Sequence, residues 1–228
     1  PRSRRGGARH AGGGAVSIAA KICGLATAEG VAAAARNGAR YVGFVFYPPS
    51  GRNITPALAS ALSAMVPAGI TKVGLFVDAD DESLDAALAG APLDLLQFHG
   101  RESPERVLWA KRRFGKPVMK AIPVASAADL DQAQRYYGAA DLLLFDAKPP
   151  KDAVVPGGNG LVFDWELLGG RRWPVPWMLS GGLSPENLVE AVRITHATAV
   201  DVSSGVERAP GIKDPERIGA FLARAREL

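Results

Sequence analysis

Cysteine is almost absent from this chain, whose 228 residues include a single one, Cys23. A lone cysteine excludes an internal disulfide, so we expect a reducing, cytoplasmic setting. Histidine is also scarce, and its three copies lie far apart in the sequence, at His10, His99 and His196. One cysteine and three scattered histidines do not provide the closely spaced ligands of a zinc centre. We therefore predict that the chain has no metal site.

Long apolar segments are missing as well. No stretch approaches the roughly 18 consecutive apolar residues of a membrane-spanning helix, and no secretory signal is visible. From these two absences we expect a soluble protein that has no membrane partner.

Acidic residues are missing from the first ten positions, which hold four arginines. The whole chain has 27 Lys and Arg against 23 Asp and Glu, so these four arginines account for the net charge of +4. We interpret residues 1–15, rich in Arg, Gly and Ala, as a disordered basic tail, and residues 16–228 as one folded domain. The domain itself has balanced charge, which argues against a nucleic-acid partner.

Eight short apolar runs, typical of strands buried on both faces, alternate with helix-like stretches. The runs begin near Ile18, Tyr41, Lys72, Asp94, Val118, Leu142, Trp177 and Ala199. Helix-start signals stand at Thr27, Thr55, Ser103, Ser126, Ser184 and Asp214. No GxGxxG sequence follows the first run, and the glycine-rich turns come late, after the seventh and eighth. Eight strands and about eight helices in this order predict a single (β/α)8 barrel rather than a doubly wound open sheet.

The active site of such a barrel lies at the C-terminal ends of its strands. Polar residues stand at most of these ends in this sequence. They are Cys23, Arg52, His99, Asp146, Ser180 and Asp201. Side chains alternate along a strand, so Lys21 shares a face with Cys23, and Gln97 shares one with His99. A lone cysteine is more often a small buried apolar residue, but polar groups gathered at one end of an apolar barrel predict an active site.

Two loops near the C-terminus have the composition of a phosphate site. Ser180–Gly182 precedes a helix-start signal, and Asp201–Gly205 follows the next apolar run. Glycine lets backbone N–H groups approach an anion closely, and (β/α)8 barrels commonly bind phosphate with the loops after strands seven and eight. We predict a small phosphorylated substrate, bound through Gly181, Gly182, Ser203 and Ser204.

A series of segments, in order and covering seven of the eight predicted strands, resembles the phosphoribosylanthranilate isomerase family. The segments are Lys21–Gly24, Gly43–Arg52, Lys72–Val77, Leu96–Gly100, Leu144–Asp146, Pro156–Gly160, Phe163–Trp165, Leu179–Gly182 and Asp201–Glu207. The resemblance runs from about Ser17 to Leu228. Family members often have proline where this chain has Gly51, a difference that bears on the shape of that loop.

The resemblance implies an Amadori rearrangement in tryptophan biosynthesis, in which an aminoaldose phosphate becomes an aminoketose phosphate without metal or organic cofactor. It implies that Asp146 is the general acid and Cys23 the general base. It also implies that Arg52 meets the substrate carboxylate and that Asp201 contacts the anthranilate amine. The resemblance leaves His99 as either a wall of the substrate site or an internally bonded histidine.

Each catalytic role makes a physical demand. Because a free thiol is mostly protonated at neutral pH, we predict that the Lys21 cation lowers the pKa of Cys23. Asp146 must hold a proton, which desolvation or a nearby negative charge such as Asp201 would favour.

Three alternatives remain open from the sequence. They are a related barrel acting on the histidine-pathway aminoaldose or on both substrates, a metal-dependent ribulose-phosphate epimerase type, and a barrel that binds a phosphorylated ligand without catalysis. The Pro- and Gly-rich residues 148–160 form a long connection that we interpret as either a lid over the site or an insertion. We expect the chain to be a monomer or a homodimer.

Overall fold

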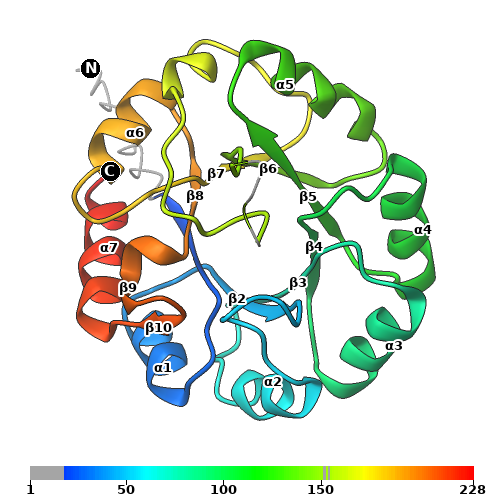
Figure 1. Cartoon of the computed structure of the whole chain (residues 1–228). Helices are drawn as coiled ribbons and strands as arrows, with labels where there is room; N and C mark the ends of the chain where they lie inside the picture. Colours follow the sequence, from blue (N-terminus) through cyan, green and yellow to red (C-terminus); the bar gives the residue numbers. More distant parts are fainter. Residues whose placement is uncertain (1–17, 151–152, 154) are drawn as a thin grey trace, which may run out of the picture.

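The structure is a computed structural model that describes residues 18–150, 153 and 155–228. Eight parallel strands form a closed barrel in which consecutive strands pair and β1 pairs with β8 (Figure 1). The strands are β1 (Ala19–Cys23), β2 (Tyr41–Phe46), β3 (Thr71–Phe76), β4 (Leu95–Phe98), β5 (Val118–Val124), β6 (Leu142–Ala147), β7 (Trp177–Leu179) and β8 (Ala199–Val202). The closed barrel confirms the predicted (β/α)8 fold. The predicted disordered tail, residues 1–15, lies outside the described residues.

Seven α-helices surround the barrel in the described part of the chain (Figure 1). They are α1 (Ala28–Arg36), α2 (Pro56–Ser63), α3 (Asp81–Gly90), α4 (Pro104–Phe114), α5 (Ala127–Asp131, continued by the 3-10 helix η1, Gln132–Tyr136), α6 (Leu188–Thr195) and α7 (Pro215–Glu227). Most start signals act as caps: the Thr27 hydroxyl, for example, accepts the Gly30 N–H at 3.1 Å. The signal at Ser184 does not, since α6 begins at Leu188 with Asn187 at its N-cap. Between β6 and β7 the described residues form only the 3-10 helix η2 (Trp165–Leu167). Prolines and glycines at 149–160 disfavour the expected α-helix there.

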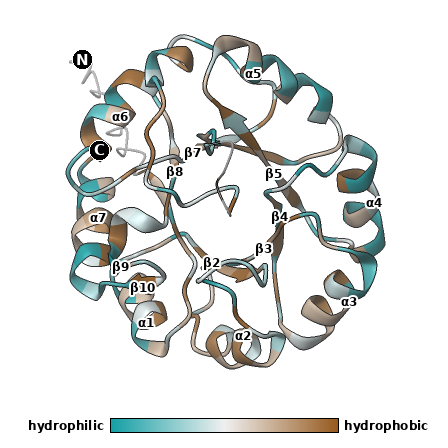
Figure 2. Cartoon of the chain, in the orientation of Figure 1, coloured by the Kyte–Doolittle hydropathy of each residue, from teal (hydrophilic) through white to brown (hydrophobic). Residues whose placement is uncertain are grey.

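The side chains that point into the barrel interior form apolar clusters. The strands are correspondingly coloured as hydrophobic in Figure 2. One cluster consists of Val73, Leu95, Met119, Ala121, Leu144 and Met178. Another contains Cys23, Val45 and Leu75. Lys21, two residues before Cys23 on the same face of β1, is fully buried. A cation in this apolar interior needs a partner, which the site supplies.

A short antiparallel hairpin lies between β8 and α7, outside the barrel (Figure 1). It consists of β9 (Glu207–Ala209) and β10 (Ile212–Lys213), and the 3-10 helix η3 (Ser204–Val206) precedes it. Within the described ranges, no helix has the length and apolar character required to cross a membrane.

Candidate active site

A pocket opens at the C-terminal ends of the strands and contains about 720 Å³ of space, its open mouth included. All nine site residues that the sequence predicts line this pocket. They are Cys23, Arg52, His99, Asp146, Gly181, Gly182, Asp201, Ser203 and Ser204. They follow or end β1, β2, β4, β6, β7 and β8. The barrel thus brings together residues that are up to 181 positions apart in the sequence.

Cys23 lies at the end of β1, buried beside an ion pair. The Lys21 Nζ lies 2.9 Å from Asp201 Oδ1, and the two side chains are 0% and 5% exposed. A Cβ atom at Gly43 would come within 3.1 Å of both the Cys23 Sγ and the Lys21 Nζ, so glycine leaves room for both groups. Burial raises the pKa of the Cys23 thiol, and the Lys21 and Lys213 cations oppose this rise without cancelling it. The effect of Lys21 has the predicted direction, but the net shift is upward.

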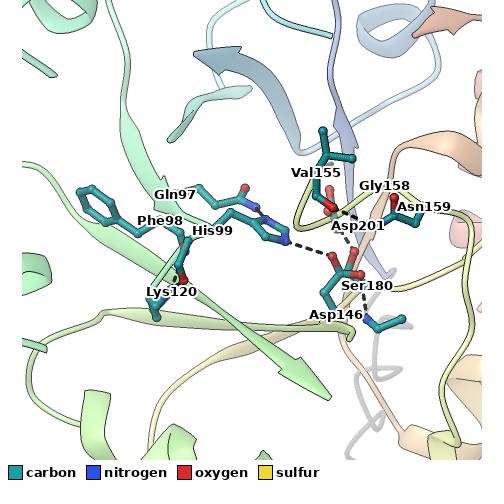
Figure 3. Close-up of polar contacts among 12 residues, drawn as sticks. Gln97, Phe98, His99, Lys120, Asp146, Val155, Gly158, Asn159, Ser180 and Asp201 are labelled. Carbon is teal, nitrogen blue, oxygen red and sulfur yellow. Dashed lines mark hydrogen bonds and ion pairs between the residues drawn. The ribbon is translucent and has the colours of Figure 1, made fainter. Parts of the chain in front are cut away.

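Asp146, near the end of β6, is hydrogen bonded to His99 (Figure 3). Its Oδ2 lies 3.0 Å from His99 Nε2, and its Oδ1 accepts the Ala147 N–H at 2.9 Å. On the other side of the ring, Gln97 Nε2 lies 3.0 Å from His99 Nδ1. When the Gln97 amide donates to Nδ1, the ring proton is on Nε2 and is donated to the Asp146 carboxylate. His99 is therefore both a pocket wall and the direct partner of Asp146.

Asp201, expected as a negative neighbour of Asp146, has polar partners of its own. Lys21 binds its Oδ1, and the Ser180 hydroxyl donates to its Oδ2 at 3.2 Å. Among the described residues, the polar partners of the Asp146 side chain are His99 and Ala147. Because a buried lysine neutralises Asp201, its carboxylate places little net negative charge in the pocket.

The loop after β7 is shaped to bind an anion through its backbone. Gly181 and Gly182 have φ values of 89° and 65°, a region that only glycine enters without strain. A Cβ at Gly182 would also lie 2.6 Å from the carbonyl oxygen of Leu161. In the described part of the chain, the N–H groups of Gly181, Gly182 and Ser204 donate to no backbone acceptor. Backbone N–H groups with no backbone acceptor can bind an anion, so the predicted phosphate site at this loop stays a prediction.

The Ser203 side chain is already used by the protein. Its hydroxyl donates to the carbonyl oxygen of Cys23 at 3.2 Å and lies 3.1 Å from Lys213 Nζ. Lys213 also donates to the Ser203 carbonyl oxygen at 2.8 Å. Ser203 therefore joins the ends of β1 and β8, and this part of the pocket is held by side chains rather than left free for a ligand.

The Arg52 guanidinium is held by an acid that the sequence did not single out. Its Nε and Nη2 lie 2.7 and 2.9 Å from the two carboxylate oxygens of Glu207, and its Nη2 also donates to the Gly158 carbonyl oxygen at 3.1 Å. Lys213 binds the same carboxylate at 2.7 Å. Glu207 belongs to the last of the segments that carry the family resemblance, but no local sequence pattern pairs it with Arg52.

The connection between β6 and β7 passes over Asp146 and His99. A Cβ at Gly157 would come 2.6 Å from His99 Nε2 and 2.8 Å from Asp146 Oδ2, so the backbone packs directly on this pair. Residues 155–161 line the pocket. Among the described residues, no group of three or more His, Cys, Asp or Glu side chains is arranged to hold a metal ion.

The N-(5′-phosphoribosyl)anthranilate isomerase family model matches residues 20–224. The isomerase of Paracoccus denitrificans is 60% identical over 210 residues, which are 92% of this chain and 98% of the relative. The crystal structure of the Thermotoga maritima isomerase superimposes with a TM-score of 0.81 at 36% identity, covering 92% of this chain and all of that one. An isomerase in complex with reduced 1-(o-carboxyphenylamino)-1-deoxyribulose 5-phosphate gives a TM-score of 0.77 at 34% identity over the same shares.

These similarities extend over the whole barrel and include the pocket that its strand ends form. The chain belongs to the N-(5′-phosphoribosyl)anthranilate isomerase family.

Proposed function

We propose that this chain converts N-(5′-phosphoribosyl)anthranilate into 1-(2-carboxyphenylamino)-1-deoxyribulose 5-phosphate, with Asp146 as general acid and Cys23 as general base. The reaction is the step of tryptophan biosynthesis that defines the family. The observation that carries the assignment of roles is the placement of a thiol and a carboxyl group, from β1 and β6, in the pocket that also holds the glycine loop after β7. The isomerase structure that holds a reduced product analogue supports the substrate class.

The first step opens the ribose ring. Asp146 gives its proton to the ring oxygen, the bond between that oxygen and C1′ breaks, and the nitrogen lone pair forms a C=N bond at C1′. The resulting Asp146 carboxylate accepts a hydrogen bond from His99 Nε2, which lies 3.0 Å from it. His99 thus stabilises the acid after it has lost its proton.

The second step moves a proton from C2′. The Cys23 thiolate takes this proton, and the electron pair of the C–H bond shifts to form an enolamine. The enolamine then gains a proton at C1′ and releases its hydroxyl proton, which gives the aminoketose. The proton gained at C1′ comes from the Cys23 thiol, which restores the thiolate, and the released hydroxyl proton returns to the Asp146 carboxylate, which restores the acid, so the reaction is a net isomerisation.

The remaining pocket residues bind and orient the substrate. The N–H groups of Gly181, Gly182 and Ser204 bind the phosphate, and Arg52 binds the anthranilate carboxylate with a charge-assisted contact. Asp201 accepts a hydrogen bond from the anthranilate amine while Lys21 holds its carboxylate in place. We count Ser203 in the phosphate site through its backbone, since its hydroxyl is bonded within the protein.

Turnover can be followed by the loss of phosphoribosylanthranilate fluorescence, with purified protein in excess chelator. We expect turnover by the unaltered protein and losses of several orders of magnitude in Cys23→Ala and Asp146→Asn. Folded but inactive unaltered protein would contradict the function, and the histidine-pathway aminoaldose would then be tried, followed by binding of the phosphorylated ligand alone. Full activity in either variant would contradict the role given to that residue.

Several finer assignments are also proposals. We infer that residues 16–228 act as one catalytic domain, in the cytoplasm, on a small phosphorylated molecule and without a nucleic-acid partner. We infer a monomer or a homodimer; one related structure is described as monomers generated from the dimeric Thermotoga maritima isomerase. Sedimentation of the purified chain would distinguish the two states.

A further inference from the structure

The β9–β10 hairpin lies outside the eight-stranded barrel, yet it places two charged side chains beside the pocket. Its strands pair Glu207 with Lys213, and these side chains are only 5% and 3% exposed. Burying charged groups is unfavourable unless each is matched. Their partners outside the hairpin are Arg52 and Ser203, which both line the pocket.

Glu207 holds one edge of the Arg52 guanidinium. Its Oε1 receives Arg52 Nε at 2.7 Å and Lys213 Nζ at 2.7 Å, while its Oε2 receives Arg52 Nη2 at 2.9 Å and the Gly211 N–H at 3.1 Å. Four donors satisfy both carboxylate oxygens. No hydrogen bond within the described residues uses Arg52 Nη1. Glu207 therefore holds the Nε and Nη2 side, Gly158 accepts a second hydrogen bond from Nη2, and Nη1 is left for another acceptor.

Glycine positions fit the backbone around this arginine. A Cβ at Gly24 would lie 2.7 Å from Arg52 Cδ, so the arginine stem rests on the loop after β1. A Cβ at Gly211, whose φ is 79°, would lie 2.8 Å from the carbonyl oxygen of Gly51, so the hairpin turn packs on the loop that carries Arg52. The hairpin thus contacts the Arg52 loop through its backbone as well as through Glu207.

The charge of the cluster also matters. Arg52 and Glu207 alone would form a neutral pair and would attract a carboxylate only weakly. Lys213 adds a second cation to the one anion, which leaves a net charge of +1 beside the pocket. Lys213 also donates to Ser203 in the loop after β8, so it joins the arginine to the side of the pocket that binds phosphate.

We propose that Glu207 and Lys213 are positioning residues for substrate specificity: Glu207 orients Arg52 toward the anthranilate carboxylate, and Lys213 keeps the cluster cationic while holding the phosphate loop. This inference rests on the proposed function, in which Arg52 binds that carboxylate. Neither residue touches the reacting carbons in this scheme. Their effects should therefore appear in substrate and product binding more than in the chemical step.

Isothermal titration calorimetry can test this with two ligands, the reduced product analogue and ribose 5-phosphate, which lacks the carboxylate. We expect Glu207→Gln to weaken binding of the analogue about 10- to 100-fold, which is the loss typical of one charge-assisted contact. The affinity for ribose 5-phosphate should change little. Lys213→Met should weaken the binding of both ligands. In steady-state kinetics, Glu207→Gln should raise KM by more than it lowers kcat.

Arg52→Met provides the decisive background. Glu207→Gln should have no further effect on the analogue once Arg52 is absent, because Glu207 acts through it. Asp85→Asn is the matched control: Asp85 pairs with Arg113 on the exposed outside of the barrel, at 3.2 Å from its Nε, and its loss should leave both affinities unchanged.

Two results would overturn the inference. Equal weakening of both ligands by Glu207→Gln, or further weakening in the Arg52→Met background, would assign Glu207 a general structural role. If Arg52→Met binds the analogue as tightly as the unaltered protein, Arg52 does not bind the carboxylate and the inference is wrong. Turnover by the unaltered protein would still support the isomerase function in that case. If Glu207→Gln does not fold, Glu207→Asp can replace it, because it keeps the charge but shortens the side chain. We expect it to weaken binding of the analogue by the same factor and to leave binding of ribose 5-phosphate unchanged.

Discussion

Replacing Lys21 by methionine isolates the electrostatic support of Cys23, the proposed general base. The Lys21 ammonium group is fully buried next to Cys23, and methionine fills a similar volume without charge. Lys21 and Lys213 are the cations that lower the pKa of the Cys23 thiol against the effect of burial. Without Lys21, the pKa must rise further, and the fraction of thiolate at any given pH must fall.

The structure sets the size of this effect. The Cys23 Sγ and the Lys21 Nζ both lie 3.1 Å from one point, the Cβ position of Gly43, so at most about 6 Å separates them. At an effective dielectric constant of about 20, unit charges at about 6 Å interact by about 3 kcal/mol. Loss of Lys21 also leaves Asp201 without its cation, and part of the change is relieved if Asp201 takes up a proton. We therefore expect the pKa of Cys23 to rise in Lys21→Met.

Because Cys23 is the only cysteine, the rate of thiol alkylation against pH reports this group alone. The pH dependence of kcat/KM should move to higher pH by the same amount. Lys72→Met is a suitable control, since Lys72 pairs with Asp94 at 3.1 Å away from the pocket. Lys21→Met combined with Asp201→Asn removes both charges and should give a smaller rise. An unchanged or lowered pKa in folded Lys21→Met would refute the reasoning.

Three other changes have definite expected outcomes. His99→Asn should lower kcat about 10- to 100-fold with a smaller change in KM, since the Asp146 carboxylate loses its donor; unaltered steady-state kinetics would contradict this role. Gly157→Ala should lower kcat while circular dichroism stays native, because the new methyl group would press on His99 and Asp146; a fully active variant would show that the loop yields freely. Lys120→Met should reduce the free energy of unfolding in urea by about 3–5 kcal/mol by leaving Glu102, 2.9 Å from Lys120 and buried, without its cation. Adding Glu102→Gln should restore part of this loss, and additive losses would argue against the ion pair as the cause.

The parts of the fold that the sequence predicted are those with a strong local signal. Parallel strands buried on both faces appear as continuous apolar runs, and each observed strand begins within one residue of its predicted start. Helix α3 was not identified, although Asp80 caps it through the Ser83 N–H at 2.8 Å and acids occupy its first turn. The alternation of strands and helices correctly predicted the barrel but also led to an expected helix between β6 and β7 that the described residues lack.

The pocket residues were predictable because barrel topology places all strand ends at one edge. The side chains that these residues bind were not predictable, because such pairs depend on three-dimensional distances that the spacing in the sequence does not reveal. Glu207 and Arg52 are 155 positions apart and meet only because the hairpin after β8 folds back over the loop after β2. The expected link between Asp201 and Asp146 relied on the same kind of reasoning, and the structure gives each carboxylate a separate partner.

The two cations near Cys23 belong to separate networks. Lys21 reaches Cys23 from within the barrel and is tied to Asp201, whereas Lys213 comes from the hairpin and is tied to Glu207. Each cation is partly neutralised by its own acid, so together they oppose the effect of burial without overcoming it. The resting thiol therefore stays protonated more readily than a free cysteine, and either network can change the strength of the base. Glu207 also holds Arg52, so in the proposed mechanism a contact between Arg52 and the substrate carboxylate is coupled through Lys213 to the thiol that takes the C2′ proton.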